Sequence, residues 1–278
     1  MKIKFILPLL IFALLLGGCA KKNTTDTKKP VNTAATKLLI NELPLKDRPF
    51  TVLVPHESGK IFTFYTKNAD KANAASIDLE YQSGDLLKGA RATLDVPVAN
   101  TYVKAVVLGS CSTGGKCTFD TDLKAGTIKF KLNFPGIDAT HVLKGDFTFV
   151  KGQKNLPDGK VILDLAKTKT ADTYIMMNSF GLPKALDKTT VLYPITISST
   201  SDKNLVGTLT INQSDVTSAL IYDGTDYQPL KFTQKDNTLT FKLDQKPWSQ
   251  PATIVRDDLH GSQESTVLYL VGPIVLVK

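Results

Sequence analysis

The sequence predicts an all-β protein built from antiparallel, sandwich-like sheets, and three observations support this fold class. Apolar and polar residues alternate over short stretches, most clearly from Ile128 to Phe134, which places the apolar side chains on one face of a strand. Gly, Asp, Asn and Pro residues, which are typical of turns, separate these stretches. No segment of any length has a convincing 3.6-residue period, so no long helix is expected.

Each expected strand is a run of this kind, taken in chain order. In the first half of the chain the runs lie at 50–54, 61–66, 77–81, 94–98, 101–108, 128–134 and 142–150. In the second half they lie at 160–165, 190–198, 205–211, 218–222, 228–233, 239–243, 251–256 and 266–277. The last run is too short for a membrane segment and has Gly272-Pro273 at its centre. We expect it to form a strand buried on both faces, bent or broken at Pro273.

Three turns can be placed between these runs. Pro157-Asp158-Gly159 and Asp223-Gly224 contain residues that tolerate positive φ. Lys235-Asp236-Asn237 joins two alternating runs at close spacing. Residues 218–243 are therefore predicted to form a three-stranded meander.

The domain organisation follows from length and composition. A chain of 278 residues with 42% hydrophobic and 22% charged residues can bury a substantial core and is neither disordered nor collagen-like. Residues 151–157 and 167–170 are poor in apolar side chains, which predicts two β-domains, 41–155 and 156–278. One large sandwich is the alternative.

The net charge of +8 is concentrated outside the predicted fold. Seven of the lysines precede residue 41, and from residue 41 onward 27 basic side chains are balanced by 25 acidic ones, a net charge of +2. The lysines of the fold alternate with Asp and Thr instead of clustering, so we expect no nucleic-acid partner.

The N-terminus has the three parts of a secretory signal: Lys2 and Lys4, an apolar run from Phe5 to Leu16, and small residues before Cys19. Leu16-Gly17-Gly18-Cys19 matches the lipobox, and here the sequence resembles bacterial lipoprotein precursors. The resemblance implies a signal peptide over 1–18 and an acylated, palmitate-bearing Cys19. An ordinary cleaved signal with an incidental cysteine is the alternative.

A lipid anchor and a tether follow from this resemblance. Two or three acyl chains on Cys19 hold a protein durably on a membrane, so the membrane is an expected partner. Similar lipoproteins go to the outer membrane unless Asp follows the cysteine, and Ala20 follows it here. We expect an outer-membrane protein that faces either the periplasm or the exterior. Residues 19–40 are polar and without apolar period, which predicts a flexible tether.

Cys111 and Cys117 are separated by five residues that include Gly114-Gly115. In an exported protein this spacing favours a disulfide that closes a short loop. A redox pair would need C-x-x-C spacing, and zinc would need further ligands nearby. We expect no metal and no cofactor.

The histidines His56, His141 and His260 are the only candidate imidazole bases. Asp257, Asp258, His260 and Ser262 bring together an acid, a base and a hydroxyl, as in a nucleophilic triad. Neighbours in sequence rarely form a triad, and no G-x-S-x-G or H-E-x-x-H motif is present. His56-Glu57 stands alone, and a polar loop around residue 260 is the favoured interpretation, with no catalytic residue assigned.

Several other groups have a structural explanation that is simpler than a functional one. Asp120-Thr121-Asp122 and Asp223-Gly224-Thr225-Asp226 offer carboxylates to calcium, but neither has the ligand spacing of an EF-hand, and both suit turns. No pair of carboxylates is marked out for glycoside hydrolysis. Trp248 is either an exposed recognition anchor or, as is more usual, an aromatic plug at a sheet edge.

These observations predict a non-enzymatic, lipid-anchored envelope protein that binds another envelope protein, a glycan or a host surface. The first alternative is a lipid-anchored hydrolase that uses His260 with Asp257 or Asp258. The second is a carrier of apolar ligands, which would need a cavity inside a β-domain.

Overall fold

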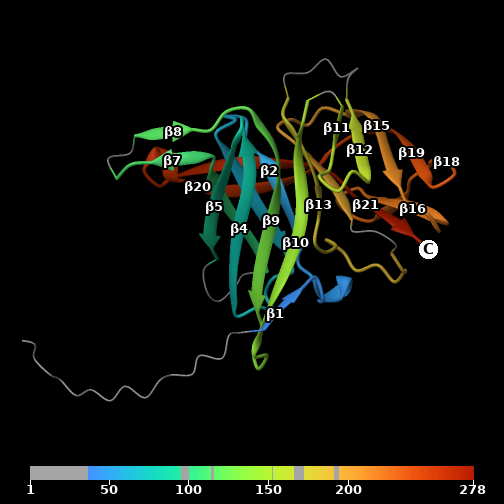
Figure 1. Ribbon diagram of the computed structural model, residues 1–278, viewed down its shortest axis with the longest axis horizontal. Coiled ribbons are helices and arrows are strands. Elements are labelled where there is room, and N and C mark those ends of the chain that lie inside the picture. Colours follow the sequence, from blue (N-terminus) through green and yellow to red (C-terminus); the bar gives the residue numbers. More distant parts are fainter. Residues whose placement is uncertain (1–36, 95–99, 114–115, 152, 166–171, 191–193) are drawn as a thin grey trace, which may run out of the picture. The chain divides into compact units, whose positions relative to one another are not determined.

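The alternating runs form strands in the computed structural model, which describes residues 37–94, 100–113, 116–151, 153–165, 172–190 and 194–278. Figure 1 shows an architecture of antiparallel sheets. The helical elements of the described residues are two 3-10 turns, η2 (Leu45–Asp47) and η3 (Asp257–Leu259). The all-β, sandwich-like prediction is therefore confirmed.

A central sheet of eleven strands runs through the molecule in the order β17-β16-β21-β14-β13-β10-β9-β4-β5. Strand β1 pairs in parallel with β10, and β20 pairs with β21. The bounds of these strands are β1 Lys37–Ile40, β4 Ala74–Ser83, β5 Leu86–Thr93, β9 Leu123–Asn133, β10 Ala139–Val150, β13 Tyr174–Asn178, β14 Ile195–Ser199, β16 Ser218–Tyr222, β17 Tyr227–Pro229, β20 Trp248–Arg256 and β21 Ser262–Val277.

Two smaller sheets cover the central sheet, and a two-stranded ribbon lies apart from them. One sheet has the order β2-β3-β6, the other the order β11-β12-β15-β19-β18, and the ribbon is β7-β8. Their bounds are β2 Phe50–Pro55, β3 Ile61–Lys67, β6 Thr101–Val107, β7 Gly109–Cys111, β8 Cys117–Phe119, β11 Gln153–Asn155, β12 Val161–Asp164, β15 Leu205–Asn212, β18 Thr233–Lys235 and β19 Thr238–Gln245.

The two smaller sheets pack on opposite faces of the central sheet. Strand β13 shows this best, because its residues alternate between two hydrophobic clusters. Ile175 and Met177 belong to the cluster under β2-β3-β6, which we call the aromatic core. Tyr174 and Met176 belong to the cluster under the five-stranded sheet, which we call the aliphatic core. All of β13 is therefore buried, and β13 does not show the polar–apolar alternation of a strand with one solvent face.

A third layer covers the outer face of β2-β3-β6. The β20–β21 hairpin lies over this sheet, so that Ile254 of β20 packs against Ile61 and Ala105. Strand β21 belongs to both layers: its C-terminal part pairs with β14 and β16, and its N-terminal part pairs with β20. As a result, nearly all residues of β3 are buried on both faces.

The expected strands are confirmed for most runs, and the exceptions have physical reasons. Strand β21 is continuous and is buried on both faces over its C-terminal half, with the register shift of β14 and β21 at Gly272-Pro273. The strand expected at 94–98 lies largely outside the described residues. Six strands of the described residues were not expected: β1, β5, β7, β8, β11 and β13. Strands β7, β8 and β11 have three residues each, too few to show a period, and the exposed edge strand β5 and the doubly buried strand β13 lack a clear alternation.

The predicted meander at 218–243 is wrong in its pairing. Residues 227–229 pair with β16 in the central sheet, whereas residues 233–235 pair with β19 in the five-stranded sheet. The chain changes sheets at Leu230, whose buried side chain enters the aliphatic core. The three predicted turns are present, with positive φ at Gly159, Gly224 and Asp236.

Contacts group Thr36–Lys278 into one compact unit. The central sheet takes β10 from one side of the predicted boundary at residue 155 and β13 from the other, and these two strands pair directly. Residues 37–40, at the end of the predicted tether, form strand β1 against Ala139–Val142. The predicted signal peptide and Cys19 lie outside the described residues.

Candidate functional site

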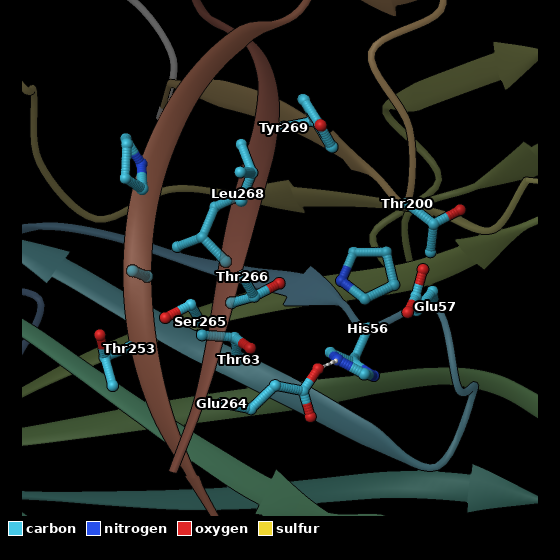
Figure 2. Close-up of a pocket in the computed structure, with 14 residues that line it drawn as sticks. His56, Glu57, Thr63, Thr200, Thr253, Glu264, Ser265, Thr266, Leu268 and Tyr269 are labelled. Atoms are coloured by element: carbon cyan, nitrogen blue, oxygen red, sulfur yellow. Dashed lines mark hydrogen bonds and ion pairs between the residues drawn. The ribbon is translucent and has the colours of Figure 1, made fainter.

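A cleft of about 650 Å³ lies beside the N-terminal half of β21. One wall consists of Glu264–Tyr269 with the neighbouring β20 residues 251–253, and the other consists of residues 55–57 and Thr200, with Thr63 of β3 between them. Figure 2 shows His56, Glu57 and Thr200 on one side of the β20–β21 ribbon and Thr253 on the other. The volume of the cleft is within the usual range for ligand sites.

The cleft exists because β14 ends before β21 does. Strand β14 pairs with β21 as far as Ser199, opposite Tyr269. Beyond this point the Ser199 hydroxyl bonds to the backbone of Ser201, and Thr200 N–H donates to Thr173 O at 3.2 Å. The chain therefore turns away, and β21 continues to Ser262 with β20 on one edge only. Local Ser and Thr hydrogen bonds of this kind commonly end strands.

An ion-pair network lies at one end of the cleft, and two of its members, His56 and Glu264, line the cleft. The His56 ring contacts Glu264, with 2.9 Å between Nε2 and Oε1. Arg256 Nη1 donates to the other oxygen of Glu264 at 2.6 Å, and its Nε and Nη2 donate to both oxygens of Asp258 at 2.7 Å. The Arg256 and Asp258 side chains are 7% and 3% exposed, so water screens this ion pair little, whereas the Glu264 side chain is 32% exposed where it meets the cleft.

The register of the hairpin brings these groups together. Even-numbered residues of β20 face β3, so Ile254 and Arg256 are buried while Val255 is exposed. Glu264 lies opposite Ile254 in the ladder and therefore points to the same face as Arg256. His56 reaches this face from the β2–β3 turn, where Gly59 adopts a φ of 65°.

Both ring nitrogens of His56 are occupied. Ser58 N–H donates to Nδ1 at 3.1 Å, which requires a lone pair on Nδ1 and puts the proton of the neutral ring on Nε2, facing Glu264. The Ser58 hydroxyl is 2.9 Å from Nδ1 and also accepts from Lys60 N–H. The hydrogen bonds of Ser58 to His56 and Lys60 therefore stabilise the turn, and its side chain is not part of the cleft lining.

The network shifts the pKa values of its carboxyl groups downward. Hydrogen bonding from His56, together with that from Arg256, lowers the pKa of Glu264. The hydrogen bonds from Arg256 lower the pKa of Asp258, and the two carboxylates raise the pKa of Arg256. At neutral pH these groups are ionised and hold each other in place.

The structure separates the members of the triad considered from sequence. His260 is exposed at the end of η3 with a φ of 55°, and no hydrogen bond joins its ring to another described residue. Asp258 faces Arg256, and Asp257 and Ser262 are not brought to His260 by any hydrogen bond among the described residues. The hydrolase centred on His260 therefore has no support in the geometry.

The other residues singled out from sequence have structural roles. Cys111 and Cys117 form the expected disulfide between β7 and β8, with Cα atoms 4.0 Å apart. Trp248 is a plug: its ring packs on Phe50 and Tyr222, and its Nε1 donates to Gly272 O at 2.6 Å. Buried His141 packs edge-on against Phe134, and its Nδ1 has no partner among the described residues.

The two acidic turns also use their carboxylates locally. Asp120 accepts a hydrogen bond from the Tyr81 hydroxyl at 2.7 Å, and Asp223 accepts from the backbone of Thr225 and Asp226. Among the described residues, no group of three or more His, Cys, Asp or Glu side chains is arranged to hold a metal ion.

A second cavity of about 600 Å³ opens at one end of the aromatic core. Its lining combines apolar side chains such as Ile61 and Phe149 with Asp120, Lys124 and Lys151. The rings of Phe62 and Phe149 stack there, with 5.3 Å between their centroids, and both are buried from solvent. These apolar groups therefore belong to the packed core. The cleft beside β21 is therefore the stronger candidate site.

The chain was compared with protein-family models, curated proteins and solved structures, and none of them matches it. The described residues contain no helix that is long and apolar enough to cross a membrane. Sequence reasoning noted His56 but missed Glu264 and Arg256. The charged residues in the otherwise alternating runs near 256 and 264 were the available signal. Their presence does not indicate that Glu264 contacts His56, 208 positions away.

Proposed function

We propose that this chain is a lipid-anchored protein of the bacterial envelope that binds a ligand in the β21 cleft without transforming it. The anchor is supported by the lipobox at Leu16–Cys19 and its resemblance to lipoprotein precursors. Binding is supported by a cleft of ligand size beside an incomplete sheet edge. The partner is an envelope protein, a glycan or a host ligand.

The state of His56 is the observation that favours binding over catalysis. A general base needs a ring nitrogen within reach of the proton that it removes. Here Nδ1 faces the Ser58 turn and Nε2 faces Glu264, so neither is directed to a cleft hydroxyl. The hydroxyls of Thr200, Ser265 and Thr266 instead offer neutral donors and acceptors to a polar ligand.

The anchor is tested by fractionating cells that express the full-length chain or its Cys19→Ala variant. We expect the wild type in the outer membrane and the variant in the soluble periplasmic fraction, because two or three acyl chains anchor durably. Labelling of intact cells with a membrane-impermeant reagent then distinguishes surface display from a periplasmic orientation. If both proteins are soluble, the anchor is refuted.

The ligand site is tested in the same cells with a photo-crosslinking amino acid at position 265. Ser265 is exposed and lines the cleft, whereas Lys242 is exposed on β19 of the five-stranded sheet and is the matched control position. We expect a crosslinked adduct from position 265 and none from position 242. Adducts from neither position, or equally from both, would refute the cleft as the ligand site.

A further inference from the structure

We infer that the ligand of the cleft is an extended polypeptide segment that joins the sheet as a new strand along Glu264–Leu268 of β21. This inference rests on the proposed function, because it takes the cleft as the ligand site. It specifies the partner as a protein with an exposed extended segment, and the mode of binding as main-chain pairing.

One edge of β21 pairs with no strand of the described residues over Glu264–Leu268. Strand β20 pairs with Ser262–Leu270 on one edge, and β14 reaches the other edge only from Tyr269 onward. In an antiparallel ladder the N–H and C=O groups of alternate residues point to opposite edges. Within the described residues, no strand meets the groups that Glu264–Leu268 direct away from β20, and this side of β21 adjoins Thr200 and the cleft.

This edge of β21 also lacks the protection that the edge strands β5, β6, β17 and β20 have. Proteins blunt exposed strand edges with Pro, with charged side chains or with short strands. Strand β20 carries Pro251 at its centre, β5 carries Lys88 and Arg91, β6 carries Lys104, and β17 is three residues long and ends in Pro229. Residues 264–268 read Glu-Ser-Thr-Val-Leu, with no Pro, Lys or Arg, and the Glu264 carboxylate is held by His56 and Arg256.

The walls of the cleft suit a peptide backbone that carries particular side chains. Ser265, Thr266 and Thr200 line the cleft and can bond to amide groups. Val267 also lines the cleft, is 42% exposed and offers an apolar contact. It lies two residues after Ser265, so the two side chains are on the same face of β21. The carboxylate of Glu57 on the facing wall makes no ion pair with another described residue, so the segment is expected to carry a Lys or Arg beside it.

The test measures binding of octapeptide pools to the full mature chain in solution. In each pool the fourth position is fixed as Lys, Ala or Glu and the other positions are varied. We expect the Lys pool to bind about threefold more tightly than the Ala pool and the Glu pool to bind most weakly, as for an exposed ion pair. This preference should disappear in the Glu57→Gln variant.

Two exposed valines on the same hairpin provide matched variants. Val267 on β21 and Val255 on β20 are both 42% exposed, but only Val267 lines the cleft. Val267→Lys gives the edge a charged side chain of the kind that β5 and β6 carry, and we expect peptide binding to weaken at least about tenfold. Val255→Lys adds the same charge outside the cleft and should leave binding unchanged.

Amide hydrogen exchange identifies the mode of binding. We expect a bound peptide to protect alternate amides within Glu264–Leu268, because only alternate N–H groups face the free edge. Methylation of alternate peptide nitrogens should abolish binding in one register and not in the other. Uniform protection, equal losses in both valine variants, or failure of every pool to bind would overturn the inference. A crosslink at position 265 to a glycan would overturn it too, while the proposed ligand site would stand.

Discussion

The two faces of the central sheet are covered by cores of different kinds. The aromatic core contains nine buried rings, those of Phe50, Phe62, Phe64, Tyr65, Tyr81, Phe130, Phe147, Phe149 and Phe180. The aliphatic core consists mainly of Val, Leu and Ile, with Tyr174 and Phe241 as its buried rings. Only the aromatic side carries a further layer, the β20–β21 hairpin, and only there does a buried ion-pair network occur among the described residues.

This difference shows how the cleft beside β21 arises from the additional layer formed by the β20–β21 hairpin. The outward residues of the five-stranded sheet, such as Thr210 and Lys242, meet solvent and need no partners in the protein. The outward residues of β3 lie under the hairpin, so polar groups there must be paired within the protein. His56, Arg256 and Glu264 satisfy one another at this layer boundary, and the cleft begins where the layers separate.

Removing one ring from each core should have the largest effect on stability. Phe62→Ala and Phe241→Ala both empty a fully buried site, and each is expected to lower the free energy of unfolding by about 4 kcal/mol. Phe62 also touches three other rings, so its loss should exceed that of Phe241 by about 1 kcal/mol. Urea denaturation followed by Trp248 fluorescence measures both.

The same experiment tests whether the two sides unfold together. Strand β13 contributes to both cores, so Phe241→Ala should shift the Trp248 transition even though Trp248 packs against the aromatic core. In the Phe241→Ala variant, the urea midpoint could shift by circular dichroism but not by Trp248 fluorescence. That result would mean that the two sides unfold separately.

The buried ion pair of Arg256 and Asp258 belongs to the aromatic side of the molecule. Arg256→Met leaves the buried carboxylate of Asp258 without its cation, and we expect a loss of about 3 kcal/mol. Adding Asp258→Asn removes that charge, so the double variant should be more stable than Arg256→Met alone. A double variant whose loss equals the sum of the two single losses would show that the pair is not coupled.

The ion-pair network should also make stability depend on pH, with a smaller effect. Because the pKa values of Glu264 and Asp258 are lowered in the folded chain, the unfolded chain binds protons first as the pH falls. The stability that they contribute is present above the ordinary carboxyl pKa of about 4 and is lost as the pH falls through their folded values. Glu264→Gln should reduce the difference between the free energies of unfolding at pH 7 and pH 3 by about 1 kcal/mol. An unchanged difference would contradict this assignment.

The fold was predictable where one face of a strand meets water. Strands β4, β9 and β19 alternate because each has a solvent face, and the expected runs 77–81, 128–134 and 239–243 identify all three, although β9 begins five residues before its run. Strand β13 was missed because both of its faces are buried, which removes the alternation. The change of sheet at Leu230 was missed for a related reason: alternation shows that a strand exists but does not show which sheet it joins.

The site was predictable only in part. Sequence singled out His56 and the charged loop near residue 258, but it grouped the loop with His260, which the left-handed turn at that residue directs into solvent. The turns around Asp223 and Asp236 and the disulfide of Cys111 and Cys117 were predicted correctly, since they depend on residues close together in the chain. Glu264 and His56 are 208 positions apart, and their meeting depends on the hairpin lying over β3.

The strand class, the turns, the short-range disulfide and the expectation of a lipid anchor could be predicted from sequence, because each depends on local spacing or on a contiguous motif. The tertiary structure alone decided that two sheets pack on opposite faces of a third and that β20 and β21 add a further layer. It also decided that β14 pairs with β21 only from Tyr269 onward, which leaves one edge of Glu264–Leu268 beside a cleft without a partner strand among the described residues. The physical reason is that strand pairing and layer packing are long-range choices, set by which buried faces fit together and not by any one segment.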